Sequence, residues 1–137
     1  MNRDSHSDEQ ILDILSLKKI AVIGMSKHSS KAAHYVPKYL IDNGYDVTPV
    51  NPTAEKILDV TCYDSISEIY GDVDVIDVFR PSEQISSIIR DCIEKKPKVI
   101  WLQEGIHDFE SEELARKAGI LVVFNRCMLA EHMRLGL

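Results

Sequence analysis

The sequence lacks the features that mark membrane, secreted and nucleic-acid-binding proteins. No apolar run approaches the roughly 20 residues that a membrane-spanning helix needs. The first ten residues are polar and acidic, unlike a secretion signal. The formal charge of −6 offers no broad basic surface to a nucleic acid or a lipid headgroup layer. We therefore expect a cytoplasmic protein with no nucleic-acid partner and no membrane partner.

Cysteine is scarce, and the sequence carries no familiar catalytic motif. Cys62, Cys92 and Cys127 are odd in number and widely spaced, so they predict reduced thiols and neither a zinc site nor a disulfide framework. No nucleophile-elbow, Walker or zinc-helix motif occurs. We therefore expect no metal and no enzymatic activity. The candidate acids and bases are His28, His34, Glu104 and His132.

Short apolar runs alternate with amphipathic segments along the whole chain. Strands are predicted at 20–23, 45–50, 73–79, 98–103 and 120–124, with helical segments between them. This alternation is typical of an α/β three-layer Rossmann-like domain, with a five-stranded parallel sheet of order 3-2-1-4-5 and helices on both faces. At 137 residues, we expect one domain over 1–137. It comprises an N-terminal helix at about 7–17, a core at about 18–127 and a C-terminal tail at 128–137.

Two acidic residues and one proline add detail to this arrangement. The strand 73–79 alternates apolar residues with Asp74 and Asp77, which indicates an edge position. Pro37 is tolerated only in the first turn of a helix, because its ring clashes with the carbonyl four residues back. The second helix is therefore predicted to start near Ala33.

The first strand ends in a glycine, as nucleotide-binding strands often do. Gly24 lets a ligand approach the backbone, and the next helix N-terminus favours an anion. The alternative is a tight turn without a ligand. Ser26 and Ser29 stand where the dinucleotide fingerprint G-x-G-x-x-G has its later glycines. The second strand ends in Asn51 with no carboxylate for a ribose, so a dehydrogenase is disfavoured.

The predicted strand ends gather positive charge in a net acidic chain. The carboxyl ends of parallel strands meet at one edge, where open α/β sheets bind ligands. Arg80 and Arg126 follow two of these strands. Lys27, His28, Lys31 and His34 follow the first strand. This set favours an anion such as a phosphorylated nucleotide, and the alternative for both arginines is an ordinary surface ion pair.

Motifs in the same order along the chain resemble a known family. They are Ala21-Val22-Ile23-Gly24-Met25-Ser26, Tyr39-Leu40 with Gly44-Tyr45, Pro49-Val50-Asn51-Pro52, Val75-Ile76-Asp77-Val78-Phe79-Arg80, Val99-Ile100-Trp101-Leu102-Gln103-Glu104-Gly105, and Arg126-Cys127 with Glu131-His132. Together they resemble the small stand-alone CoA-binding proteins with a Rossmann-like fold. These are related to the nucleotide-binding domain of the succinyl-CoA synthetase α subunit. The resemblance covers nearly all of residues 15–135.

This resemblance implies that coenzyme A lies across the strand ends, and it assigns a role to most candidate residues. Gly24 and Ser26 would contact phosphate, Asn51 and Pro52 would flank the adenosine, Phe79 and Arg80 would meet the nucleotide, and Gln103 and Gly105 would line the path of the pantetheine arm. Lys27 and Lys31 are candidates for the 3′-phosphate from their charge and position, and Arg126 completes the candidate set.

The sequence thus predicts a protein that binds CoA or an acyl-CoA without catalysis of its own. Two alternatives stay open: an NAD(P)- or other nucleotide-binding protein, and a regulatory subunit that acts through a protein partner. A homodimer is a possible assembly. The sequence leaves open whether the ligand is free CoA or an acyl ester. It also leaves open whether Cys127 is simply packed or forms a mixed disulfide with the CoA thiol.

Overall fold

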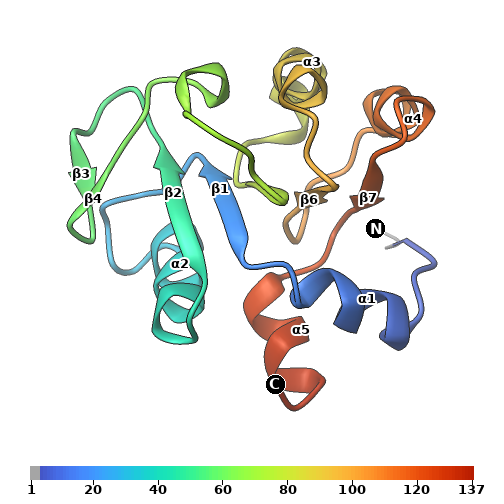
Figure 1. The fold of residues 1–137 in the computed structure, drawn as a ribbon, viewed down its shortest axis with the longest axis horizontal. Coiled ribbons are helices and arrows are strands. Elements are labelled where there is room, and N and C mark those ends of the chain that lie inside the picture. The colour runs from blue at the N-terminus through green and yellow to red at the C-terminus, as the bar shows by residue number, and fades with distance from the viewer. Residues whose placement is uncertain (1–3) are drawn as a thin grey trace.

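Five parallel strands form one sheet in the computed structural model, which describes residues 4–137 (Figure 1). The order across the sheet is β2-β1-β5-β6-β7. The strands are β1 (Lys19–Ile23), β2 (Asp46–Val50), β5 (Val75–Val78), β6 (Val99–Leu102) and β7 (Leu121–Val123). Each neighbouring pair runs parallel.

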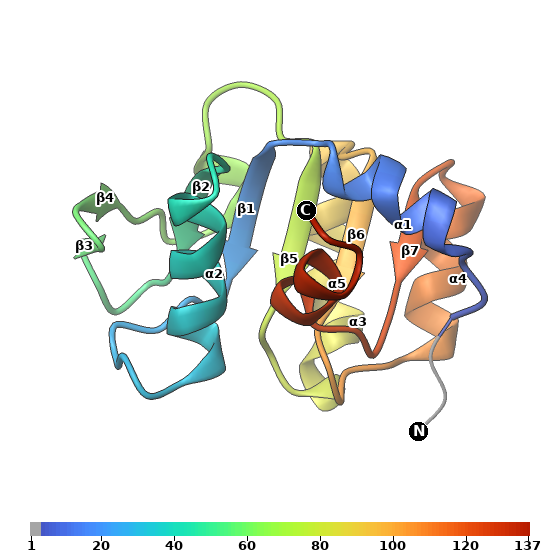
Figure 2. The same cartoon turned by 90° about the horizontal axis from the view of Figure 1, so that it is seen from below.

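Helices cover both faces of this sheet and bury it (Figures 1 and 2). One face is covered by α1 (Asp8–Leu15), α2 (Ala32–Asp42) and α5 (Met128–Arg134), and the other by α3 (Ile85–Lys95) and α4 (Phe109–Lys117). In β1, Ile20 and Val22 pack in the first layer while Ala21 packs in the second. A strand buried on both faces reads as a continuous apolar run, because each alternate residue meets a helix. The three-layer Rossmann-like prediction is confirmed.

The remaining elements are short and lie outside this sheet. They are the hairpin strands β3 (Lys56–Ile57) and β4 (Val60–Thr61) and the 3-10 turns η1 (Ile66–Glu68) and η2 (Ser82–Gln84). None of the helices within residues 4–137 has the length and apolar character of a membrane span.

The predicted position of the strand 73–79 is wrong. β5 lies between β1 and β6, and all four of its residues are buried. The third position of the 3-2-1-4-5 pattern, beyond β2, is held instead by a single parallel bridge between Tyr63 and Val50. With that bridge counted, the sheet follows the pattern and β7 adds one more strand. Asp77 explains the error, because a buried carboxylate in a central strand imitates the alternation of a half-exposed edge.

The chain reverses direction across the sheet between β1 and β5. From β1 it moves to β2 on one side, and it then returns to β5, β6 and β7 on the other. The helix connections that leave β1 and β5 therefore diverge, and a crevice opens at the carboxyl ends of these two strands. This switch point is where the fold places a ligand.

Candidate functional site

Two open cavities border the carboxyl ends of the strands, and they share Arg80. The first has a volume of about 500 Å³ and the second of about 550 Å³. The first is lined by Ile23, Gly24, Met25, Ser26, Lys27, His28, Lys31, Val50, Asn51, Pro52, Thr53, Asp64, Arg80, Gln84 and Ile88. The second is lined by Ala32, Ala33, Tyr35, Phe79, Arg80, Pro81, Gln103, Glu104, Gly105, Ile106 and Cys127.

The structure brings ten of the eleven candidate binding residues to these two cavities. Gly24, Ser26, Lys27, Lys31, Asn51 and Pro52 line the first, Phe79, Gln103 and Gly105 line the second, and Arg80 lines both. Arg126 lines neither of them. The residues that the resemblance assigns to phosphate and adenosine line the first cavity and those assigned to the pantetheine arm line the second, whereas Phe79, assigned to the nucleotide, lines the second.

Gly24 allows the end of β1 to pass directly against the end of β5. Its φ is +83°, and a Cβ built on it would lie 2.6 Å from the Phe79 carbonyl oxygen and 2.7 Å from Arg80 Cδ. Only glycine tolerates this backbone conformation and this close approach. The protein's own packing therefore requires Gly24, whether or not a ligand binds. A side chain there would also displace Arg80 from its place between the cavities.

The loop after β1 is fastened to α2 through a carbonyl that a proline leaves free. Pro37 lies inside α2 and has no N–H to donate to the Ala33 carbonyl four residues back. The Ser26 N–H donates a hydrogen bond to this carbonyl at 3.0 Å. The buried His34 ring contacts the Ser26 carbonyl through Nδ1 at 2.7 Å. The helix starts at Ala32, close to the predicted start, but Pro37 lies beyond its first turn.

These contacts limit what Ser26 can offer a ligand. Its N–H is engaged by α2, and its Oγ accepts a hydrogen bond from the His28 N–H at 3.1 Å. The hydroxyl proton is still available to donate. Ser26 is thus a hydroxyl donor facing the first cavity and a fixed point of the loop.

Asn51 joins the loops that follow β1 and β2. Its Nδ2 donates to the Met25 carbonyl at 2.8 Å. Its Oδ1 accepts from the Thr53 N–H at 2.8 Å and from the Thr53 hydroxyl at 2.7 Å. An asparagine that caps its own turn in this way holds the backbone rather than a ligand. Asn51 therefore shapes the wall of the first cavity and sets the position of Pro52.

Positive charge at the first cavity is exposed and largely unpaired. Lys27, Lys31 and Arg80 line it with one carboxylate, Asp64. Arg80 donates from Nε to the neutral Gln84 Oε1 at 2.9 Å and makes no ion pair within residues 4–137. A guanidinium with free donors binds phosphate oxygens in a bidentate geometry. The first cavity therefore suits a phosphorylated ligand.

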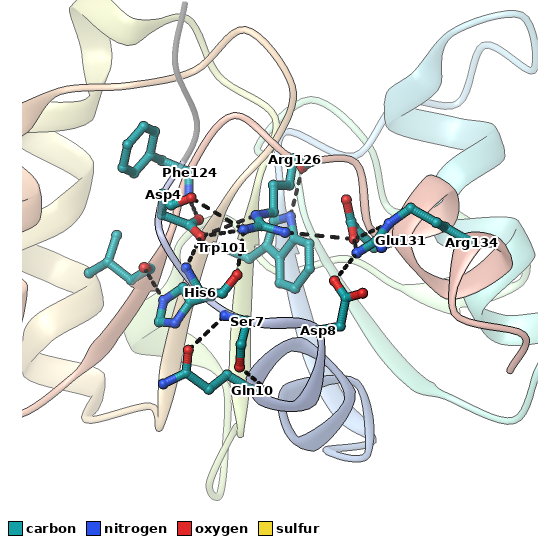
Figure 3. Close-up of polar contacts among 11 residues, drawn as sticks. Asp4, His6, Ser7, Asp8, Gln10, Trp101, Phe124, Arg126, Glu131 and Arg134 are labelled. Atoms are coloured by element: carbon teal, nitrogen blue, oxygen red, sulfur yellow. Dashed lines mark hydrogen bonds and ion pairs between the residues drawn. The ribbon is translucent and has the colours of Figure 1, made fainter.

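Arg126, in contrast, is buried in an ion-pair network with the N-terminal segment (Figure 3). Its Nη2 lies 2.7 Å from Asp4 Oδ1, and its Nη1 lies 3.7 Å from Glu131 Oε2. The Trp101 ring N–H donates to the Arg126 carbonyl at 2.7 Å. Contrary to the expectation, Arg126 lines neither cavity. Its guanidinium is instead ion-paired with Asp4, more than 120 residues away in sequence.

Gln103, which lines the second cavity, forms a polar pair with Asp77, which does not line the cavity and is not among the candidate residues. Asp77 is wholly buried, and its Oδ1 accepts from Gln103 Nε2 at 2.6 Å. Its Oδ2 has no partner. Burial raises the pKa of Asp77 to about 7, although the Gln103 hydrogen bond acts to lower it. The sequence signal for Asp77 is an acid within an apolar strand, a pattern that also indicates an edge strand.

The candidate acids and bases do not converge on one point. His28 lines the first cavity and Glu104 the second, while His34 is held by the loop. His132 lies on α5, where its Nδ1 pairs with the Tyr39 hydroxyl at 2.7 Å. Burial lowers the pKa of His132. The four groups therefore form no shared acid–base arrangement.

An open α/β sheet with a cation-lined cavity at its switch point defines a Rossmann-like nucleotide-binding domain. The chain belongs to the CoA binding domain family, which matches residues 18–133. It is 35% identical over 127 residues to the uncharacterized protein YneT of Bacillus subtilis, a match that covers 92% of this chain and 94% of YneT.

A solved structure and a longer enzyme are also similar to this chain. A solved structure described as a hypothetical protein from Pyrococcus horikoshii has a TM-score of 0.92 and 38% identity, covering 98% of this chain and 99% of that one. The chain is also 32% identical over 132 residues to acetate–CoA ligase (ADP-forming) II of Archaeoglobus fulgidus. That match covers 88% of this chain but 20% of the ligase. The chain therefore corresponds to one part of that longer enzyme.

Proposed function

We propose that this protein binds coenzyme A or an acyl-CoA across the two cavities, without catalysis of its own. The observation that carries the proposal is the pair of cavities that share Arg80. Lys27 and Lys31 border one cavity, whereas Phe79 and Ile106 border the other. CoA has the same division, with a phosphorylated adenosine at one end and a pantetheine arm at the other. Membership of the CoA binding domain family supports this ligand over other nucleotides.

The charged residues that line the first cavity set the proposed orientation of CoA. The 3′-phosphate and diphosphate occupy the first cavity, near Lys27, Lys31 and Arg80. The pantetheine arm passes Arg80 and enters the second cavity beside Gln103 and Gly105. The Ser26 hydroxyl and the wall formed by Asn51 and Pro52 border the nucleotide. Gly24 contributes by leaving room for Arg80 rather than by a contact of its own.

Isothermal titration tests this proposal with CoA, dephospho-CoA and NADH. CoA is expected to bind more tightly than dephospho-CoA, because the lysines lose a phosphate partner. The variant Arg80→Ala weakens CoA binding, whereas Arg90→Ala, an exposed arginine of α3 outside both cavities, does not. The absence of heat with CoA at high protein concentration contradicts the proposal, and heat with NADH alone supports a dinucleotide instead.

A further inference from the structure

Asp77 and Gln103 form a polar pair beside the second cavity that CoA binding by itself does not explain. Asp77 lies opposite Trp101 in the β5–β6 register, and Gln103 follows two residues later, so both side chains leave the same face of the sheet. Asp77 is 0% exposed and Gln103 is 3% exposed. Burying a carboxyl group here disfavours its charged form, because the interior solvates it poorly. A buried pair beside a cavity is therefore a candidate for contact with the ligand.

The hydrogen bond to Asp77 determines which end of the Gln103 amide faces the cavity. Above pH 7, where Asp77 is mostly ionised, its carboxylate only accepts hydrogen bonds, so the amide turns its NH₂ group toward Asp77. The Gln103 oxygen, Oε1, has no hydrogen-bond partner within residues 4–137. It is also not one of the fully enclosed oxygens of residues 4–137 that lack a hydrogen-bond partner, which are Asp77 Oδ2 and Glu112 Oε1. Because Gln103 lines the second cavity, Oε1 faces that space as an acceptor.

Two donors, Tyr35 and Arg80, also line the second cavity, and the proposed function assigns Arg80 to a ligand phosphate. Glu104 and Cys127 line the same cavity. Burial raises the pKa of the Cys127 thiol, and the charges of Asp77 and Glu104 act in the same direction. A ligand end that reaches Gln103 meets an acceptor that is held by Asp77, with Glu104 in the lining of the same cavity. It is therefore favoured if it carries a donor and disfavoured if it carries another acceptor.

We propose that the second cavity selects the free thiol of CoA over a thioester, with Gln103 Oε1 as the acceptor and Asp77 as the residue that positions it. This inference rests on the proposed function, since it assumes that the pantetheine arm enters the second cavity. The free thiol supplies an S–H donor. A thioester has lost that hydrogen and brings a carbonyl oxygen to the same place. A buried acceptor then has no partner, and such mismatches discriminate strongly between similar ligands.

Three ligands that differ only at the sulfur end test the selection. They are CoA, an analogue with hydrogen in place of the thiol, and acetyl-CoA, titrated calorimetrically at pH 8 with a phosphine reductant. The reductant prevents a disulfide with Cys127, so only non-covalent binding is measured. CoA is expected to bind about 5- to 100-fold more tightly than acetyl-CoA, the range that corresponds to one unpaired buried acceptor. The analogue is expected to lie between them.

Two variants separate a positioning role from a merely structural one. Asp77→Asn keeps the size of the side chain but allows either amide orientation, so the ratio of CoA to acetyl-CoA affinity is expected to fall toward one. Glu112→Gln is the matched control, because Glu112 is also a buried carboxyl with one oxygen that has no hydrogen-bond partner, but it lines neither cavity. Its ratio is expected to match that of the original protein.

The outcomes distinguish this inference from the proposed function. Equal affinities for CoA and acetyl-CoA, or tighter binding of acetyl-CoA, overturn the thiol selection while CoA binding stands. A preference that persists unchanged in Asp77→Asn overturns the positioning role. No binding of any of the three ligands overturns the proposed function itself.

Discussion

Arg80 and Arg126 each follow a strand of the same sheet, yet the protein uses them in opposite ways. Arg80 is exposed where the two cavities meet, and within residues 4–137 its only hydrogen-bond partner is the neutral Gln84. Arg126 is 4% exposed and ion-paired with Asp4 and Glu131. A buried guanidinium requires paired charges, whereas an exposed one keeps its donors for a ligand. We infer that one arginine serves binding and the other serves the fold.

Contacts with the N-terminal segment bury and pair Arg126, whereas Arg80 stays exposed. Asp4 accepts from the Arg126 side chain and, through Oδ2, from the Phe124 N–H at 2.9 Å. The His6 carbonyl accepts from Arg126 Nη2 at 3.1 Å (Figure 3). Ser7 and Gln10 then start α1 with a capping box. The segment before α1 is thus tied to the end of β7, whereas no part of residues 4–137 pairs a carboxylate with Arg80.

The largest expected effect in this comparison is the loss of Arg126. Arg126→Ala leaves the buried Asp4 carboxylate without the Arg126 cation and removes one of the two arginines that pair with Glu131, which costs about 3–5 kcal/mol of unfolding free energy. Urea denaturation followed by circular dichroism measures it. Arg134→Ala, which removes a partly exposed partner of Glu131, serves as the milder control. A loss below about 1 kcal/mol for Arg126→Ala would show that the buried network does not stabilise the fold.

The next effect concerns the pH dependence that Asp77 imposes. Its pKa is about 7 in the folded protein and 3.8 in the ordinary reference state, so between these values the folded protein holds a proton that the unfolded chain has released. Stability therefore falls as the pH rises through this window. A shift of about three units corresponds to at most about 4 kcal/mol.

The variant Asp77→Asn tests whether Asp77 lowers stability as the pH rises. It is expected to be more stable than the original protein at pH 8 and to lose that advantage as the pH falls toward 4. Parallel urea titrations at both pH values measure the difference. An advantage that does not change with pH would mean that Asp77 has the same pKa in the folded and unfolded states.

A smaller effect, on binding rather than on folding, is expected at Arg80. Arg80→Ala removes a charge-assisted hydrogen bond to phosphate and weakens CoA binding by about 1.5–3 kcal/mol. Because Arg80 is exposed, the free energy of unfolding is expected to change by less than about 0.5 kcal/mol. Calorimetric titration and urea denaturation of the same sample measure both. A large stability loss with unchanged affinity would reverse the roles assigned to the two arginines.

The smallest effect is expected from the exposed loop lysines. Lys31→Ala is expected to weaken CoA binding by about 0.5–1 kcal/mol, since an exposed charge pair is partly screened by water and salt. Dephospho-CoA binding is expected to change little, because the 3′-phosphate is the proposed partner. Titration of both ligands measures the two changes. Equal weakening for both ligands would place Lys31 at the diphosphate instead.

The fold class could be predicted from the sequence because its signals are local. Apolar runs such as Lys19–Ile23 and the helix that contains Ile85 and Ile89 follow directly from periodicity, and all three layers were confirmed. The position of β5 could not be predicted in the same way. A polar residue in a strand indicates exposure only on average, and the buried Asp77 accepts a hydrogen bond from Gln103, which follows β6.

The candidate site likewise contains residues that local signals predict and residues whose role depends on contacts distant in sequence. Residues that line the strand ends, such as Lys31 and Gly105, follow from topology, because parallel strands end at one edge. Arg126 meets the same criterion and yet is buried, since its partner Asp4 lies at the other end of the chain. No local pattern reports such a contact. The role of Gly24 was likewise hidden, because the Phe79 carbonyl that requires it comes from a different strand.

The most direct test of the central claim is an NMR titration of the ¹⁵N-labelled protein with CoA. The account predicts that the amide signals of Lys31, Arg80 and Gly105 shift as CoA is added, because they border the two cavities. The amide signals of Phe124 and Arg126 are expected to stay in place, because the N-terminal segment covers them. Shifts centred on Phe124 and Arg126, with none at the cavities, would contradict the account.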